Sequence, residues 1–127
     1  MKAKIKGYDM KKTIIFDFDG VIHSYKSGWQ GADNIPDEPV PGIKQAIKRI
    51  RDEGYEVVVL SARCHQYGGI EAMKSWLNKY DIEVDGITRD KVPALLQIDD
   101  RCICFDGKPE SLLEKIINFK TWMDAEI

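Results

Sequence analysis

Hydrophobic residues along this 127-residue chain follow two spacings, one typical of strands and the other of helices. Short apolar runs rich in β-branched residues predict buried strands from Thr13 to the residue before Asp17, at 56–60, near 84–88 and at 95–98. Apolar residues at helical spacing predict three helices, carried by Ile43, Ala46, Ile47 and Ile50, then by Ile70, Met73, Leu77 and Tyr80, then by Leu112, Leu113, Ile116 and Ile117. Because strands and helices alternate, we expect an α/β fold with a mostly parallel sheet covered by helices.

The segments between these elements carry turn residues and short polar stretches. Residues 23–41 contain Gly28, Gly31, Pro36, Pro39 and Pro41, which exclude a long regular element and predict a structured loop. Residues 1–12 form an N-terminal extension, and Cys102 to Phe105 is a candidate for one more short edge strand. We find no internal repeat or linker, so residues 1–127 are expected to form a single domain.

Composition narrows the class of protein. Apolar residues make up 43% and charged residues 31% of the chain, which is ordinary for a globular protein and too apolar for disorder. The formal net charge of -2 argues against nonspecific nucleic-acid binding as the main function. No segment is apolar over the length needed for a signal peptide or a membrane span, so we expect a cytoplasmic protein that does not bind membranes. Cys64, Cys102 and Cys104 lack metal or redox spacing, which predicts reduced thiols in or near the core.

Two aspartates stand at the end of the first predicted strand. Asp17 and Asp19 are separated by one residue, and side chains at i and i+2 of an extended chain point to the same side. Two carboxylates in one small volume imply a cation. Carboxylate oxygens suit a hard divalent metal such as Mg²⁺, and no cysteine or histidine cluster near them indicates another metal.

Polar side chains also follow the other predicted strands. Ser61 and Arg63 follow the second strand, Lys91 comes shortly after the third, and Asp99 and Asp100 end the fourth. In open α/β sheets the ligand crevice lies beyond the carboxyl ends of the strands, so these groups are expected to converge. Carboxylates can bind Mg²⁺, which in turn binds a phosphoryl group, while a hydroxyl and an ammonium bind the other phosphoryl oxygens. Together these groups form a suitable site for a phosphoryl group.

This ordered set resembles the four motifs of the haloacid dehalogenase-like hydrolase superfamily. Asp17 to Val21 matches the first motif, Ser61 the second, Lys91 the third, and the pair Asp99 and Asp100 the fourth. The resemblance implies a three-layer doubly wound Rossmann-like fold with strand order 3-2-1-4-5. The gaps between the motifs have no room for the cap domain that many members carry. The chain is similar to small capless phage and bacterial members.

The resemblance also implies roles for the motif residues in a phosphatase. Asp17 would attack phosphorus and form an aspartyl-phosphate, which water then hydrolyses. Asp19 would protonate the leaving oxygen and later activate the water. These roles require different protonation states. Mg²⁺ would keep Asp17 ionised, and the neighbouring carboxylates would favour the protonated form of Asp19.

The remaining implied roles concern phosphate and metal. Ser61 and Lys91 would bind phosphoryl oxygens, and Gly20 belongs to the expected substrate-binding residues. The expected metal ligands are Asp17, Asp19, Asp99 and Asp100, with Asp100 preferred over Asp99 for direct binding and the Asp19 backbone carbonyl completing the set.

Each residue taken alone has a structural alternative. Asp19 with Gly20 fits a simple turn, and Asp99 to Arg101 fits a strand terminus with a surface ion pair. Arg63 suits either a substrate phosphate or a bridge to an acid. His23 and His65 are expected in loop or packing roles. Trp29 suits an anchor for the loop better than a substrate lid.

Two other functions compete with the phosphatase hypothesis. A response-regulator receiver domain has similar groups on a similar fold, but its phosphoacceptor aspartate would lie on the middle strand, where this chain has Ser61. A catalytically silent domain that binds Mg²⁺ or phosphate is the second alternative.

The substrate is less defined than the chemistry. Within the family, a capless open site is associated with large substrates such as proteins or nucleic-acid ends. Residues 58–63 and 98–101 also resemble the phosphatase half of phage-type polynucleotide kinases, which removes 3′ phosphates, and Arg63 and Arg101 carry this similarity. The expected partner is therefore a phosphorylated small molecule or a nucleic-acid end.

Overall fold

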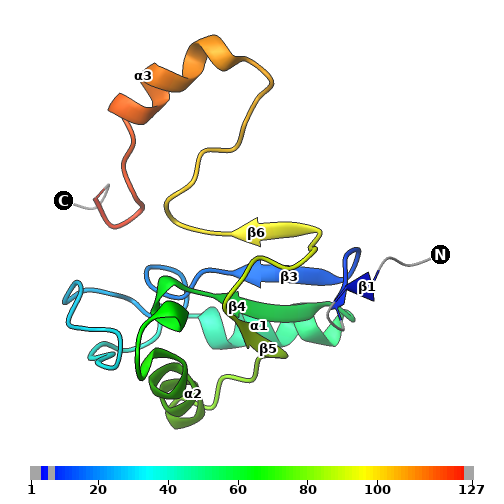
Figure 1. The fold of residues 1–127 in the computed structure, drawn as a ribbon, viewed down its shortest axis with the longest axis vertical. Coiled ribbons are helices and arrows are strands. Elements are labelled where there is room, and N and C mark those ends of the chain that lie inside the picture. Colours follow the sequence, from blue (N-terminus) through cyan, green and yellow to red (C-terminus); the bar gives the residue numbers. More distant parts are fainter. Residues whose placement is uncertain (1–3, 6–7, 125–127) are drawn as a thin grey trace.

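A four-stranded, all-parallel sheet forms the centre of the computed structural model, which describes residues 4–5 and 8–124. Its strands are β3 (Thr13–Phe16), β4 (Glu56–Leu60), β5 (Gly86–Thr88) and β6 (Leu96–Ile98). They lie in the order β5-β4-β3-β6, so the third, second, first and fourth predicted strands are neighbours as expected (Figure 1). This order confirms the doubly wound α/β fold.

In the described part of the chain, three α-helices and two short 3₁₀ helices accompany the sheet. Helix α1 (Ile43–Asp52) joins β3 to β4, and helix α2 (Gly69–Lys79) joins β4 to β5 after the 3₁₀ turn η1 (Ala62–His65). The C-terminal part contains η2 (Pro109–Ser111) and α3 (Leu112–Ile117). An antiparallel pair of two-residue strands, β1 (Lys4–Ile5) and β2 (Tyr8–Asp9), lies in the N-terminal extension and was not predicted. The rest of that extension lies partly outside the described residues.

Both faces of the central strands are buried, which explains their continuous apolar runs. Ile14 and Phe16 of β3 pair in register with Val57 and Val59 of β4, so these four side chains share one face. That face packs against residues of the helices, including Ile47, Met73, Trp76 and Leu77. On the opposite face, Ile15 and Val58 pack against Val92 from the irregular segment that crosses from β5 to β6.

The loop between β3 and α1 is fixed by one hydrogen bond within its own backbone and one from a helix side chain. The N–H of Val40 donates to the carbonyl of Ile22, and the indole N–H of Trp76 donates to the carbonyl of Asp37, both at 2.9 Å. Only this loop and α1 separate β3 from β4, and only η1 and α2 separate β4 from β5. The described segments therefore contain no cap domain. Among the described residues no helix has the length and apolarity to cross a membrane.

The expected fifth strand is absent from the described sheet. Residues 102–105 have no strand structure, because the chain turns away from β6 at Arg101, whose backbone N–H donates to the Asp99 carboxylate at 2.9 Å. Residues 101–120, which we call the C-terminal arm, project beyond the β6 edge and carry α3 with them (Figure 1). Cys102 and Cys104 are consequently exposed, and only Cys64 is buried as predicted.

Candidate active site

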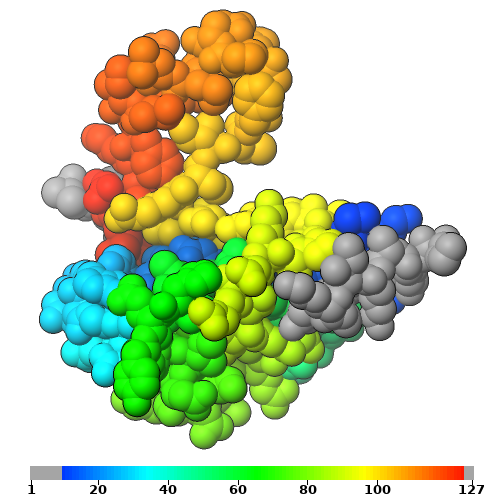
Figure 2. All heavy atoms as spheres, viewed as in Figure 1, coloured from blue at the N-terminus to red at the C-terminus, as the bar shows by residue number. Residues whose placement is uncertain are grey.

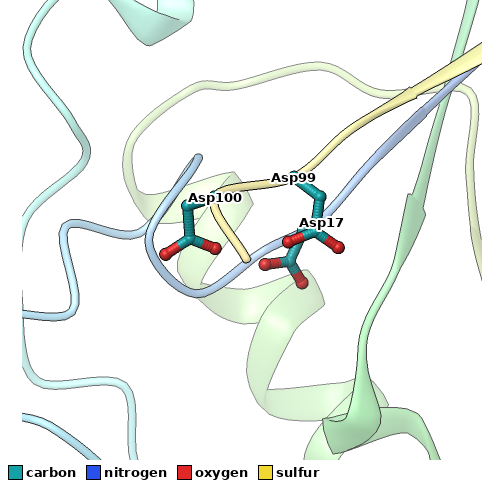
Figure 3. A group of neighbouring side chains, drawn as sticks. All are labelled: Asp17, Asp99 and Asp100. Carbon is teal, nitrogen blue, oxygen red and sulfur yellow. The ribbon is translucent and has the colours of Figure 1, made fainter. Parts of the chain in front are cut away.

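Three carboxylates meet where β3 and β6 end side by side. Oxygen atoms of Asp17, Asp99 and Asp100 all lie within 4.8 Å of one another, and Figure 3 shows their side chains gathered at these two strand ends. The Asp17 backbone N–H donates to the carbonyl of Ile98 at 2.9 Å, which continues the β3–β6 pairing up to the first acid. The sheet order therefore brings the first and fourth motifs together.

The donor set of this cluster fits a hard divalent cation. The Oδ1 atom of Asp100 is buried and has no hydrogen-bond partner within the protein. Burial and repulsion from Asp99, together with the contact to Asp100, raise the pKa of Asp17 to about 8. Burial also raises the pKa of Asp100. These carboxylates do not ionise easily together, because their negative charges repel one another. A bound Mg²⁺ would stabilise their ionised forms.

We predict that Mg²⁺ stabilises the protein more at pH 8.5 than at pH 5. Without a cation, the folded protein retains between about pH 4 and pH 8 a proton on Asp17 that the unfolded chain has lost, so stability falls as pH rises through this window. A cation beside the ionised carboxylates restores that stability. The expected result is a melting temperature raised by roughly 5 °C or more at pH 8.5 and by less at pH 5, with Mg²⁺ against a chelator.

Asp17→Asn is the control for this pH dependence. The variant has no carboxyl group to titrate at position 17. In chelator, its stability should therefore fall much less between pH 5 and pH 8.5 than that of the unsubstituted protein. An equal effect of Mg²⁺ at both pH values in the unsubstituted protein would contradict the prediction.

Asp19 points to a different set of groups. Its carboxylate accepts hydrogen bonds from the Arg63 guanidinium at 2.9 to 3.2 Å and from Nδ1 of His23 at 2.8 Å. Its side chain does not belong to the carboxylate group formed by described residues. Strand β3 ends at Phe16, and the chain turns after it, so the extended geometry expected for Asp17 and Asp19 does not apply.

The protonation of Asp19 also differs from the expectation. Burial alone would raise its pKa, but the hydrogen bonds from His23 and Arg63 and the charge of Arg63 outweigh this effect and lower the pKa below its usual value. The proton expected on Asp19 from neighbouring carboxylates is therefore disfavoured, because the neighbours of this side chain are donors.

Arg63 bridges Asp19 to the loop. The side chain is fully buried, and its Nη1 atom donates to the backbone carbonyls of Gly31 and Ala32 at 2.9 Å and of Asn34 at 3.3 Å. The Trp29 ring stacks on the guanidinium, with Cζ of Arg63 4.8 Å from the ring centroid. Of the two sequence-based alternatives, the structure has the bridge to an acid, and these contacts occupy the guanidinium expected to bind substrate. Trp29 contacts Arg63 as an anchor would.

His23 supports the same network from inside the domain. It is fully buried, and its Nε2 accepts a hydrogen bond from the backbone N–H of Asp37 at 3.2 Å. Because Nε2 accepts, Nδ1 carries the proton of the neutral ring and donates it to Asp19. The histidine therefore has the packing role that was expected, and it also orients the second aspartate.

Ser61 lies at the end of β4 beside Asp17. Its Oγ accepts a hydrogen bond from the backbone N–H of Arg63 at 3.2 Å, which orients the hydroxyl at the start of η1. A pocket of about 260 Å³ is lined by Asp17, Asp99 and Ser61, with Leu60, Ala62, His65, Arg89 and Gln97. Ser61 thus lines the same pocket as two of the clustered carboxylates.

The basic side chain of this pocket is Arg89. Lys91, the residue expected from the motif, is exposed and does not line the pocket, and its phosphate-binding role stays a prediction. Arg89 directly follows β5, which ends at Thr88, so the rule that functional groups stand at strand ends could have identified it. His65, at the end of η1, is a second lining residue to which the sequence analysis gave no site role.

Gly20 lies against the metal-ligand candidate Asp100. A Cβ atom at this position would lie 2.2 Å from Oδ2 of Asp100, and the backbone has a φ of 85°, so both space and conformation require glycine. The Gly20 N–H donates to the carbonyl of His23 at 2.8 Å, and its carbonyl accepts from the indole of Trp122 at 2.8 Å. These bonds occupy the backbone groups expected near substrate. Trp122 had no signal in the sequence analysis.

Comparison with known structures supports the fold. A conserved protein from Bacteroides thetaiotaomicron aligns at a TM-score of 0.57 with 25% identity, over 91% of this chain and 97% of that one. A chain of the Pnkp1/Rnl/Hen1 complex aligns at 0.51 with 26% identity, over 84% of this chain. A chain of the Pnkp1/Rnl/Hen1 RNA repair complex aligns at 0.50 with 20% identity, over 88% of this chain. Comparisons with protein-family models and with curated proteins gave no match.

The two repair-complex chains are much longer than this one. The present chain spans 34% and 32% of their lengths, so the likeness concerns one part of each. Strand order, the meeting of Asp17 with Asp99 and Asp100, and Ser61 beside them match the arrangement implied by the first, second and fourth motifs. The chain therefore has a haloacid dehalogenase-like fold.

Proposed function

We propose that this protein is a Mg²⁺-dependent phosphomonoester hydrolase that acts through an aspartyl-phosphate on Asp17. The observation that carries the proposal is the group of Asp17, Asp99 and Asp100 at neighbouring strand ends, in which Asp100 has a buried oxygen without a hydrogen-bond partner. These three carboxylates would hold the metal. When bound, Mg²⁺ would neutralise charge on the carboxylates and the phosphoryl group.

The chain's own residues supply the remaining parts of the reaction. An Asp17 oxygen would form a bond to phosphorus as the bond to the leaving oxygen breaks, and water would then release inorganic phosphate and regenerate the carboxylate. Ser61 would donate its hydroxyl proton to a phosphoryl oxygen, and Arg89 would bind another with its charged side chain. Both side chains line the pocket that contains Asp17.

Asp19 is suited to the second step of this reaction. Its contacts with Arg63 and His23 favour the ionised form, which accepts a proton from the attacking water. Protonating the leaving oxygen in the first step requires the form that these contacts disfavour. A substrate with a good leaving group, such as an aryl phosphate, would not need that proton.

A 3′-phosphorylated nucleic-acid end is the second candidate substrate. The observation in its favour is the likeness of 84% of this chain to a chain of the Pnkp1/Rnl/Hen1 complex, at 26% identity. Exposed Arg89 and Arg101 lie close in sequence to the ends of β5 and β6 and could bind backbone phosphates.

A phosphate-release screen tests both proposals. The substrates are an aryl phosphate, nucleotides, sugar phosphates and oligonucleotides with a 3′ phosphate, each with Mg²⁺ or a chelator. We expect Mg²⁺-dependent release, and preferential release from the oligonucleotides would favour end processing. No metal-dependent release from any substrate would contradict the enzymatic proposal and favour a silent Mg²⁺-binding domain.

A further inference from the structure

The outer edge of β6 has no pairing strand among the described residues. The sheet ends at β6, which pairs with β3 on its inner side. Leu96, the first residue of β6, is 50% exposed, and Leu95 just before it is 53% exposed. An open edge with apolar side chains is a template for another strand, and native proteins usually cover or pair it.

The C-terminal arm carries the elements that this edge lacks. Residues 102–105 read Cys-Ile-Cys-Phe, a strand-like sequence that is unpaired, and Phe105 is 59% exposed. Leu113, Ile116 and Ile117 of α3 are 60% to 72% exposed. Figure 2 shows a wide hollow between the arm, in orange, and the β6 region, in yellow. So many large apolar side chains on one short segment indicate a surface that is covered in solution.

The residues that flank the arm are both anchored at Gly20. Asp100, just before the arm, packs against Gly20, and the indole of Trp122, just after it, donates to the Gly20 carbonyl at 2.8 Å. Thr121, beside that anchor, is buried. Both anchors thus lie at the same turn, and the residues between them project past β6 (Figure 1).

We propose that two copies of this chain exchange their C-terminal arms. Residues 102–105 of one copy add a fifth strand to the β6 edge of the other, and α3 covers the exposed Leu96 there. Each copy offers one arm and one open edge, so a two-fold pair satisfies both surfaces and closes. The formal net charge of -2 gives little repulsion between two copies. This proposal does not depend on the catalytic function.

The first test is the mass of the protein in solution. Light scattering after size exclusion should give about twice the 14.5 kDa of one chain. The double variant Leu113→Glu with Ile117→Glu places charges on the docking face of α3 and should give the single-chain mass. Tyr67→Glu, at a fully exposed aromatic residue outside the arm, is the matched control and should remain a dimer. A single-chain mass for the unsubstituted protein at micromolar concentration would overturn the proposal.

Disulfide trapping then locates the contact without relying on those variants. Leu96→Cys places a thiol on the β6 edge, where it can pair with Cys102 or Cys104 of an arm. One chain carries Leu96→Cys with both arm cysteines changed to serine, and the other keeps the native arm. A covalent dimer joining these two chains after oxidation supports exchange. In the single Leu96→Cys variant, a crosslink within one chain would instead show the arm folded on its own sheet and would overturn the proposal.

The measurement of mass in solution separates this proposal from the enzymatic one. Asp17→Asn removes the proposed nucleophile, which lies outside the arm, so the variant should still give the dimer mass. An inactive dimer would therefore support arm exchange whatever the outcome of the phosphate-release screen.

Discussion

Asp17→Asn is expected to lower Mg²⁺-dependent phosphate release by about 10³-fold or more while the protein stays folded. The amide has nearly the shape of the carboxylate but cannot attack phosphorus as an anion. In chelator at pH 8 the variant should be at least as stable as the unsubstituted protein, because it removes the buried charge whose pKa is raised to about 8. Loss of activity without loss of stability would distinguish a nucleophile from a structural acid.

Asp81→Asn is a matched control for the same chemical change. Asp81 is exposed, its carboxylate pairs with Lys44 at 3.3 Å, and its φ of 55° is one that asparagine tolerates well. This variant should retain its phosphate release within about two-fold, as expected for a surface change. A labelled acyl-phosphate donor should mark Asp17 in the unsubstituted protein, and label on another aspartate would count against the mechanism.

The carboxyl ends of the strands were the part of the site most accessible from sequence. Apolar runs that stop at polar residues mark these ends locally, and parallel strands bring their ends to one edge of the sheet. Asp17, Ser61 and Asp99 were identified in this way and line one pocket in the structure. Local pattern sufficed because burial of both faces leaves the strands little freedom in length or direction.

The direction of side chains beyond the strand ends was less predictable. Asp19 was expected beside Asp17, but it follows a turn rather than an extended strand and binds Arg63 across 44 positions of sequence. Arg89 lines the pocket and Lys91 does not, although both follow β5 by only a few residues. Hydrophobic periodicity does not extend into such segments, so no local pattern defines where their side chains point.

The C-terminal arm shows the same limit at the level of an element. The sequence of residues 102–105 favours a strand, but a strand also requires a partner at the right edge, and the turn at Arg101 directs this segment away from β6. The apolar face of α3 was correctly predicted as a helix face, yet sequence pattern cannot state which surface covers it. The structure leaves this face exposed, and the covering surface that we propose is the β6 edge of a second copy.

Arg63→Met is expected to lower the free energy of unfolding by about 3 to 5 kcal/mol, because it leaves the Asp19 carboxylate without its guanidinium partner. The change also removes the donors to the carbonyls of Gly31 and Ala32, which tie the loop to the sheet. Urea unfolding monitored by tryptophan fluorescence provides the measurement. Lys48→Met, which removes an exposed i,i+4 pair with Asp52, should cost no more than about 0.5 kcal/mol.

A double-mutant cycle separates the charge pair from the packing of this buried side chain. If the cost of Arg63→Met arises mainly from the uncompensated carboxylate, adding Asp19→Asn should recover part of the lost stability, because an amide needs no counterion. Arg63→Lys should be intermediate, since a lysine retains charge but cannot bridge Asp19 and the loop carbonyls with the same fork of donors. Fully additive losses would mean that Arg63 stabilises the fold through its loop contacts and aromatic neighbours rather than through Asp19.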